Sequence, residues 1–149
     1  MWQSDVSTDI AAPVDEVFSY LADFPRHKEW SRSVTDIAPV ATNDPFGVGS
    51  EYSARESVPT KFTSYTRITA VDPPRHIAWD SADRRMMRVE WSFELSPRNS
   101  GTHLIQRSHW QPTNVLGRAV FAVMRRRQIP KENRQSLERI KAILEERAS

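Results

Sequence analysis

The last third of the chain, residues 114–147, constrains the fold most, because its pattern predicts one long amphipathic helix with a single interruption. Its second half has no glycine or proline, and apolar side chains recur there at helical spacing, as Leu137, Ile140, Ile143 and Leu144. The opposite face is charged. Such a helix is only marginally stable alone, so the rest of the chain must supply an apolar surface for it.

The first half of this stretch repeats the scheme with a predicted apolar face of Leu116, Val120, Val123 and Met124. Pro130 lies between the halves. A proline there cannot donate a hydrogen bond to the carbonyl one turn earlier, and its ring crowds that group. We therefore expect a kink at Pro130.

The beginning of the chain predicts a strand followed by two short helices. Residues 3–11 alternate between apolar and polar side chains, as in a half-buried strand. Pro13 suits the first position of a helix, where its missing N–H has no partner to lose. The apolar face of that helix is predicted to be Val14, Val17, Phe18 and Leu21. A second short helix is predicted between residues 25 and 30.

Residues 33–110 show the signals of strands and turns throughout. Clusters rich in proline, glycine, asparagine and aspartate separate predicted strands at 34–40, 50–58, 62–71, 77–80, 87–95 and 102–111. Short turns between consecutive strands imply an antiparallel meander with one buried face. The order of strand, two helices, six strands and long helix predicts a single α+β domain over residues 1–149.

Composition narrows the functional classes. The chain has 149 residues, no cysteine and a net charge of +2. Without cysteine there is no disulfide, thiolate metal site or thiol nucleophile. The small positive excess does not make a nucleic-acid surface, so no nucleic-acid partner is expected. We find neither a signal peptide nor an apolar run that spans a bilayer, and expect a cytoplasmic protein without stable membrane insertion.

Four motifs, in order along the chain, resemble the helix-grip fold of the START-like superfamily, also called SRPBCC. They are the strand-to-helix opening IAAPVDEVF (10–18), the helix junction LADFP (21–25) with Trp30, the turn GVGS (47–50), and VDPPR (71–75) with Trp79. The likeness covers nearly the whole chain. It is greatest for the bacterial polyketide cyclase/dehydrase group, which includes coenzyme Q-binding and aromatase/cyclase members.

This resemblance implies a curved antiparallel sheet of about seven strands wrapped around a long, kinked C-terminal helix. It also implies a cavity between sheet and helix that holds a hydrophobic small molecule. No residue of this chain matches a catalytic motif of the family, so the resemblance assigns no catalytic residue.

No motif points to a cofactor or metal. The chain has no glycine-rich phosphate loop, no HExxH and no G-x-S-x-G. The four histidines, His27, His76, His103 and His109, lack ligand spacing and are predicted to lie at the surface. Weak candidates for acid–base chemistry are Tyr52, Gln106, Arg67 and His109.

The predicted inward face is rich in aromatic and methionine side chains, which are typical of ligand pockets. A packed core of the same residues is the alternative. Polar side chains on that face, Ser64 among them, favour the pocket, because buried polar groups need partners. The predicted ligand contacts are Trp30, Tyr52, Phe62, Thr66, Trp79, Met87, Trp91, Phe93, Gln106, Ser108, Trp110, Phe121 and Met124.

Three further features have two interpretations each. Trp30, at the helix junction, either gates the cavity mouth or plugs the end of the sheet. The run Arg125, Arg126 and Arg127 either contacts phosphate or anionic lipid or forms a solvated helix turn. Charged residues 80–85 fit an ordinary hairpin tip.

Three functional hypotheses follow. The first is a non-catalytic carrier or sensor of a lipid-like, polyketide or polycyclic molecule. The second is a polyketide aromatase/cyclase or dehydratase acting in the same cavity. The third is a protein-interaction module, which a large exposed apolar patch would support. A monomer or a homodimer is compatible with each.

Overall fold

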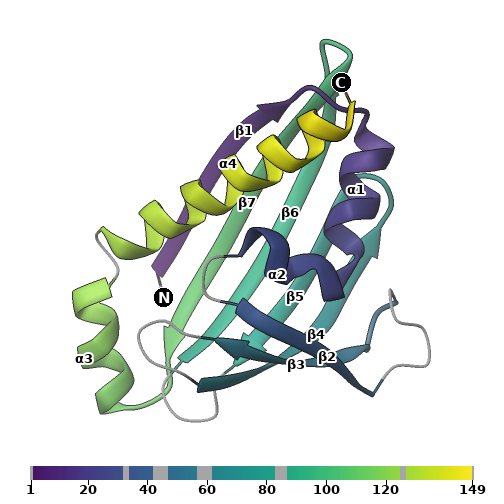
Figure 1. Cartoon of the computed structure of the whole chain (residues 1–149). Coiled ribbons are helices and arrows are strands. Elements are labelled where there is room, and N and C mark those ends of the chain that lie inside the picture. Colours follow the sequence, from purple (N-terminus) through teal and green to yellow (C-terminus); the bar gives the residue numbers. More distant parts are fainter. Residues whose placement is uncertain are drawn as a thin grey trace.

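A curved antiparallel sheet forms the body of the protein (Figure 1). The structure is a computed structural model that describes residues 2–31, 34–41, 47–56, 62–82, 87–124 and 127–148. Within these ranges, seven strands lie in the order β1-β7-β6-β5-β4-β3-β2. Their bounds are β1 Trp2–Ile10, β2 Val34–Ala41, β3 Glu51–Glu56, β4 Phe62–Asp72, β5 His76–Ala82, β6 Met87–Arg98 and β7 Gly101–Pro112.

The helices cover one face of this sheet (Figure 1). Between β1 and β2 come α1 (Val14–Ala22), the short 3-10 helix η1 (Phe24–Arg26) and α2 (His27–Trp30). After β7 come α3 (Val115–Met124) and α4 (Gln128–Ala148). The predicted helix-grip arrangement is thereby confirmed, with α4 lying along the sheet and α3 standing at its end.

The inward and outward faces of the strands follow the predicted alternation. On β6, Val89 and Phe93 are buried, whereas Arg88 and Glu90 point to solvent. The same period of two buries Gln106 on β7. Because a one-residue slip would reverse every side chain, the agreement fixes which residues can face the helices.

Two turns require residues that tolerate a positive φ angle or a close backbone approach. The β6–β7 hairpin turns through Asn99 and Ser100, which have φ angles of 50° and 69°. Gly101 follows, and a Cβ there would lie 2.4 Å from the carbonyl oxygen of Ile10, so only glycine fits. Gly49, with φ 92°, makes the turn into β3 in the left-handed region that glycine enters without strain.

α1 begins one residue later than predicted. Pro13 is the cap residue rather than the first helical residue, and its extended backbone (φ −60°, ψ 146°) precedes Val14. Its carbonyl accepts hydrogen bonds from the N–H groups of Glu16 and Val17, both at 3.1 Å. Proline serves here because a cap residue needs no N–H partner within the helix.

The C-terminal stretch forms two helices rather than one helix kinked at Pro130. α3 ends at Met124 and α4 begins at Gln128, so Pro130 lies in the first turn of α4. First-turn residues donate no intrahelical hydrogen bond, which makes a proline there harmless. The chain therefore breaks before the proline, not at it.

The predicted apolar face of α3 is also wrong in part. Leu116 and Val123 are 62% and 82% exposed, and the residues that α3 buries are Gly117 and Phe121. The prediction failed because α3 carries apolar residues on all sides, so its pattern does not select the inner face.

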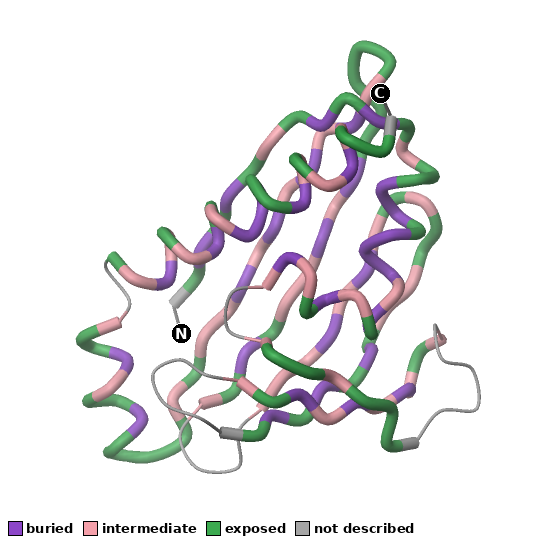
Figure 2. The backbone as a smooth tube through the Cα atoms, in the orientation of Figure 1, coloured by how far each residue is buried: buried purple, intermediate pink, exposed green. Residues whose placement is uncertain are grey.

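α4 packs firmly on β1. Its predicted apolar residues Leu137, Ile140 and Leu144 are buried in the core. Its charged side chains also contact neighbouring backbone, since Lys141 donates to the Asp9 carbonyl and Glu145 accepts from the Ala11 N–H at 2.8 Å. Figure 2 shows buried residues along the side of α4 that faces the sheet.

Candidate functional site: an internal cavity

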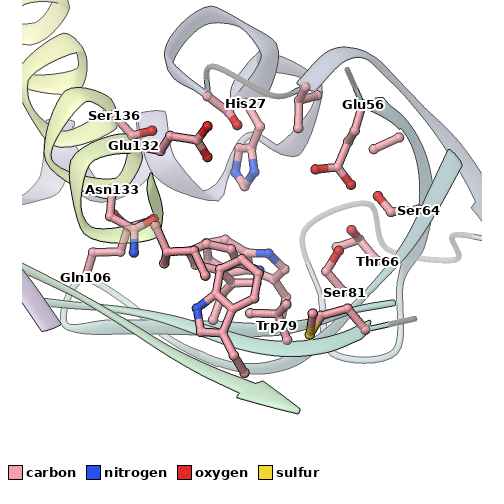
Figure 3. A pocket seen from close by; sticks show the side chains of 18 of the residues that line it. His27, Glu56, Ser64, Thr66, Trp79, Ser81, Gln106, Glu132, Asn133 and Ser136 are labelled. Atoms are coloured by element: carbon pink, nitrogen blue, oxygen red, sulfur yellow. The ribbon is translucent and has the colours of Figure 1, made fainter. Parts of the chain in front are cut away.

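A cavity of about 150 Å³ lies between the sheet and the helices. Strands β2 to β7 supply one wall, and α2, α3 and α4 supply the other. Figure 3 shows polar side chains pointing into this space from α2, α4 and the sheet. The residues that line it are His27, Trp30, Ser31, Val34, Ile37, Ala54, Glu56, Ser64, Thr66, Trp79, Ser81, Met87, Val89, Trp91, Gln106, Trp110, Val120, Met124, Ile129, Glu132, Asn133 and Ser136.

Tryptophans dominate the apolar part of the wall. Trp79, Trp91 and Trp110 come from three adjacent strands and form a continuous series, with ring centroids 6.4 Å apart for Trp79 and Trp91 and 5.5 Å for Trp91 and Trp110. Trp30 approaches from α2. Indole rings present broad, rigid apolar faces, which suits the binding of a flat molecule.

A hydrogen-bond network fixes the end of this series. The Trp110 Nε1–H donates to Ser108 Oγ at 2.9 Å. Asn133 of α4 donates to the same oxygen and to Ser4 Oγ, each at 3.4 Å. Ser108 thus joins β7 to β1 and α4 from behind the wall and holds the Trp110 ring in place.

Three buried polar atoms of the cavity wall have no hydrogen-bond partner. They are Trp30 Nε1, Ser64 Oγ and Gln106 Oε1. Among the described residues, no other buried side-chain nitrogen or oxygen is left unpaired. Such atoms are rare in folded proteins because each costs about 1–3 kcal/mol. All three belong to residues that line this one cavity, which makes it the part of the described structure where a bound water or ligand would satisfy the most buried polar atoms.

His27 is buried in the same wall. Its Nε2 lies 2.8 Å from the Leu21 carbonyl oxygen, and because a carbonyl only accepts, Nε2 carries the hydrogen. Burial lowers the pKa of His27 to about 4, and the hydrogen bond to Leu21 opposes this only partly. The imidazole is therefore neutral at pH 7, and its Nδ1 is free of a proton. The ring stacks on Phe24 with centroids 4.2 Å apart.

Two acidic side chains lie in the wall. Glu56 from β3 and Glu132 from α4 line the cavity, and no lysine or arginine is among the described lining residues. Figure 3 shows the two carboxylates on either side of His27. Gln128 donates to Glu132 at 3.3 Å, which leaves the second carboxylate oxygen for other contacts.

Of the predicted ligand contacts, eight line the cavity: Trp30, Thr66, Trp79, Met87, Trp91, Gln106, Trp110 and Met124. Four do not. Ser108 lies behind the wall, Phe121 fixes α3, and Tyr52 and Phe93 are packed in the core, where Phe24 stacks on Tyr52 at 5.3 Å. The side chain of Phe62 lies outside the described residues.

Sequence reasoning missed several lining residues. The surface position expected for His27 is wrong, because Phe24, His27 and Trp30 recur at every third residue and all face inward. That spacing was the available signal. Asn133 and Ser136 were missed as polar residues on the otherwise apolar side of α4. Asp83, Arg84 and Arg85 of the hairpin tip and Arg125 and Arg126 lie outside the described residues.

Trp30 separates the cavity from the surface. It is 4% exposed and lines both the internal cavity and a shallow groove between α2 and α4. Its ring packs edge-on against Phe93, with centroids 5.6 Å apart. In this conformation Trp30 closes the cavity toward α4, as expected of a plug or of a closed gate.

In the described ranges, no three histidine, aspartate or glutamate side chains are grouped so that they could hold a metal ion. None of the described helices combines the length and apolarity needed to cross a bilayer.

Comparison with known proteins identifies the class. Residues 1–145 match the family described as polyketide cyclase / dehydrase and lipid transport. The chain therefore belongs to this START-like (SRPBCC) family, as its motifs predicted. An uncharacterised protein of Mycobacterium tuberculosis is 34% identical over 95 residues, which are 61% of this chain and 41% of that protein. The chain thus matches less than half the length of that relative.

Solved structures share the fold. Zhui aromatase/cyclase from Streptomyces sp. R1128 is 14% identical with a TM-score of 0.79 over 99% of this chain and 96% of its own. The di-domain ARO/CYC StfQ of the steffimycin pathway is 17% identical with a TM-score of 0.76 over 98% and 52%. A START superfamily protein from Mycobacterium smegmatis is 16% identical with a TM-score of 0.70 over 97% and 95%.

Proposed function

We propose that the protein binds a small, largely apolar and aromatic molecule with neutral polar groups in the cavity between the sheet and the C-terminal helices. The observation that carries this proposal is the confinement of all three unpaired buried polar atoms to that cavity. A ligand that accepts from Trp30 and donates to Gln106 removes both penalties. A lipid-like, polyketide or polycyclic molecule meets these requirements.

The size of the cavity restricts the ligand. An apolar cavity of about 150 Å³ accepts a molecule of roughly one aromatic ring. The volume here is similar, so a single ring fits without any movement. A larger, polycyclic ligand requires part of the wall to move outward.

The charge of the wall disfavours acidic ligands. Glu56 and Glu132 lie beside the apolar surface, and the described lining residues include no lysine or arginine. A buried carboxylate on the ligand would be both desolvated and repelled. We therefore expect neutral benzyl alcohol to bind more tightly than benzoate, by at least about tenfold.

Native mass spectrometry of freshly purified protein, with organic extraction of anything bound, tests the proposal. A hydrophobic species should co-purify, or a member of a supplied panel of hydrophobic compounds should bind. The variant Ser64→Phe fills the cavity and should abolish binding. Its matched control is Thr63→Phe, because Thr63 is the adjacent, exposed residue of β4.

The control variant should bind like the wild type. If the wild type binds nothing from the panel, or Ser64→Phe binds as well as Thr63→Phe, the cavity is not the ligand site. Thermal unfolding of each variant distinguishes a blocked cavity from a damaged fold.

A second candidate function is an aromatase/cyclase or dehydratase reaction in the same cavity, and His27 favours it. A neutral imidazole with a proton-free Nδ1 in a cavity wall can accept a proton from a bound substrate. The variant His27→Gln should then abolish turnover of a polyketide mimic while ligand binding persists. Tight binding of such mimics by the wild type without turnover would reject this candidate and leave the carrier function.

A further inference from the structure

We propose that α3 is a peripheral membrane-docking helix that binds reversibly to an anionic lipid surface. The solvent face of α3 is the unusual feature. Val115, Leu116 and Val123 are 81%, 62% and 82% exposed, and Ala119 and Ala122 beside them are exposed as well. A surface helix ordinarily directs polar side chains outward, so this face is inverted.

The exposed residues form one continuous strip. At 100° per residue, Val115, Ala119, Ala122 and Val123 fall on one side of α3, opposite the buried Gly117. Figure 2 shows exposed residues on the side of α3 that faces away from the sheet. Three of the six large exposed apolar side chains found in the described ranges belong to this single helix.

Basic residues lie on α3 and in the chain that follows it. Arg118 lies on α3, Arg127 follows its end, and Lys131 and Arg134 lie in the first turns of α4, all exposed. The sequence adds Arg125 and Arg126, and it has no aspartate or glutamate between residues 95 and 131. Glu132, between Lys131 and Arg134, lines the cavity, so the exposed charges on and directly after α3 are mostly positive. An apolar helix face next to such charges is complementary to the headgroups and acyl boundary of anionic lipid.

The combination of apolar strip and positive charge also favours one binding partner of α3 over others. A nucleic acid would use the arginines but not the apolar strip. A second copy of the chain would bring two sets of cations together, which costs energy in a closely packed interface. An anionic bilayer satisfies both the apolar strip and the cations.

The inner side of the same helix faces the cavity. Val120 and Met124 of α3 line it, whereas the outer strip is exposed. α3 is thus a thin wall between the cavity and the proposed lipid surface. Docking there brings the cavity within one helix diameter, about 10 Å, of the membrane.

Vesicle co-sedimentation of the full chain tests the inference. The protein should sediment with vesicles of phosphatidylcholine and phosphatidylglycerol in roughly equal amounts, but not with phosphatidylcholine alone. Binding should weaken at about 1 M salt, where charge attraction is screened. The variant Arg118→Gln/Lys131→Gln should weaken binding by about fivefold per removed charge.

A matched pair of variants isolates the strip. Leu116→Gln/Val123→Gln should abolish sedimentation, and Val40→Gln/Val48→Gln should not. The control pair is apt because Val40 and Val48 are 57% and 67% exposed outside α3. Circular dichroism checks that each variant keeps its helix content.

Three results would overturn the inference. They are no sedimentation of the wild type with anionic vesicles, equal sedimentation of both variant pairs, or a wild-type dimer that Leu116→Gln/Val123→Gln converts to a monomer. The last would assign the strip to contact between copies. Ligand binding by the cavity is measured separately, so either proposal can fail alone.

Discussion

The two C-terminal helices differ in composition and relate to the protein in opposite ways, because α3 is apolar on nearly all sides whereas α4 is amphipathic and charged. α4 buries its apolar residues against β1 and exposes charges, several of which contact the backbone of other elements. α3 buries little more than Gly117 and Phe121 and exposes most of its apolar residues. Both helices line the cavity.

This difference indicates a division of roles. α4 has the buried area and the hydrogen bonds to act as a fixed wall that maintains the fold. α3 has few contacts to lose, and segments with few buried contacts open at low free-energy cost. We propose that α3 is the part of the wall that moves to admit a ligand larger than one ring.

The largest effect is expected from shortening a buried side chain of α4. Ile140 is fully buried, so Ile140→Ala should lower the free energy of unfolding by about 4 kcal/mol through lost burial and a residual cavity. Val123→Ala in α3 should change it by less than about 0.5 kcal/mol. Urea unfolding measures both. If the two variants lose similar amounts of unfolding free energy, α3 contributes to the fold as much as α4 does.

A second effect, of about 3 kcal/mol, concerns the fixed side of the cavity. His27 has a pKa of about 4 when folded and an ordinary value near 6.5 when unfolded, so between these values the native state binds fewer protons. Its contribution to stability is complete above pH 6.5 and is lost as the pH falls towards 4. Unfolding free energies of the wild type and His27→Gln, measured from pH 7 to 4, should diverge accordingly.

Carboxyl groups also titrate in that pH range. The informative quantity is therefore the difference in unfolding free energy between the wild type and His27→Gln. Glu56 and Glu132 line the same cavity, and repeating the pair in a Glu132→Gln background assigns the divergence to His27. Parallel curves for the wild type and His27→Gln would mean that the imidazole is hydrated in solution.

The strands could be predicted from the sequence because alternation fixes the faces wherever one face is apolar. Gln106 and Ser108 were placed on the inward face correctly, although both are polar, because Leu104 sets the register of β7. α3 resisted prediction because nothing in its all-round apolar pattern selects an inner face. The break between the helices lies before Pro130 rather than at it, because the first turn of a helix tolerates proline.

The cavity wall was predictable only in part. Sequence places Tyr52, Phe93, Trp79 and Trp91 on the same inward face. Phe24 of η1 stacks on Tyr52, which does not line the cavity, whereas Trp79, which Phe24 contacts edge-on, does line it. Such contacts between distant elements are not encoded in strand periodicity. Alternation therefore could not distinguish rings packed in the core from rings that line the cavity.

A third effect, of about 2 kcal/mol, tests the network that joins α4 to the wall. Ser108→Ala removes the oxygen that accepts from Trp110 and Asn133 and leaves those donors without it. The unfolding free energy should fall by that amount, and the near-ultraviolet circular dichroism of Trp110 should change. Ser96→Ala, at an exposed position of β6, should leave both unchanged.

The last effect is local rather than global and concerns the contact that fixes α3. Phe121 stacks near Trp110 with ring centroids 6.4 Å apart, a contact worth about 1 kcal/mol beyond its buried area. Phe121→Ala should release α3 without unfolding the protein, because α4 and the sheet keep their own contacts. Hydrogen exchange should therefore accelerate at the amides of α3 and remain slow in α4. If exchange accelerates equally in both helices, they unfold as one unit, and the mobile wall assigned to α3 is wrong.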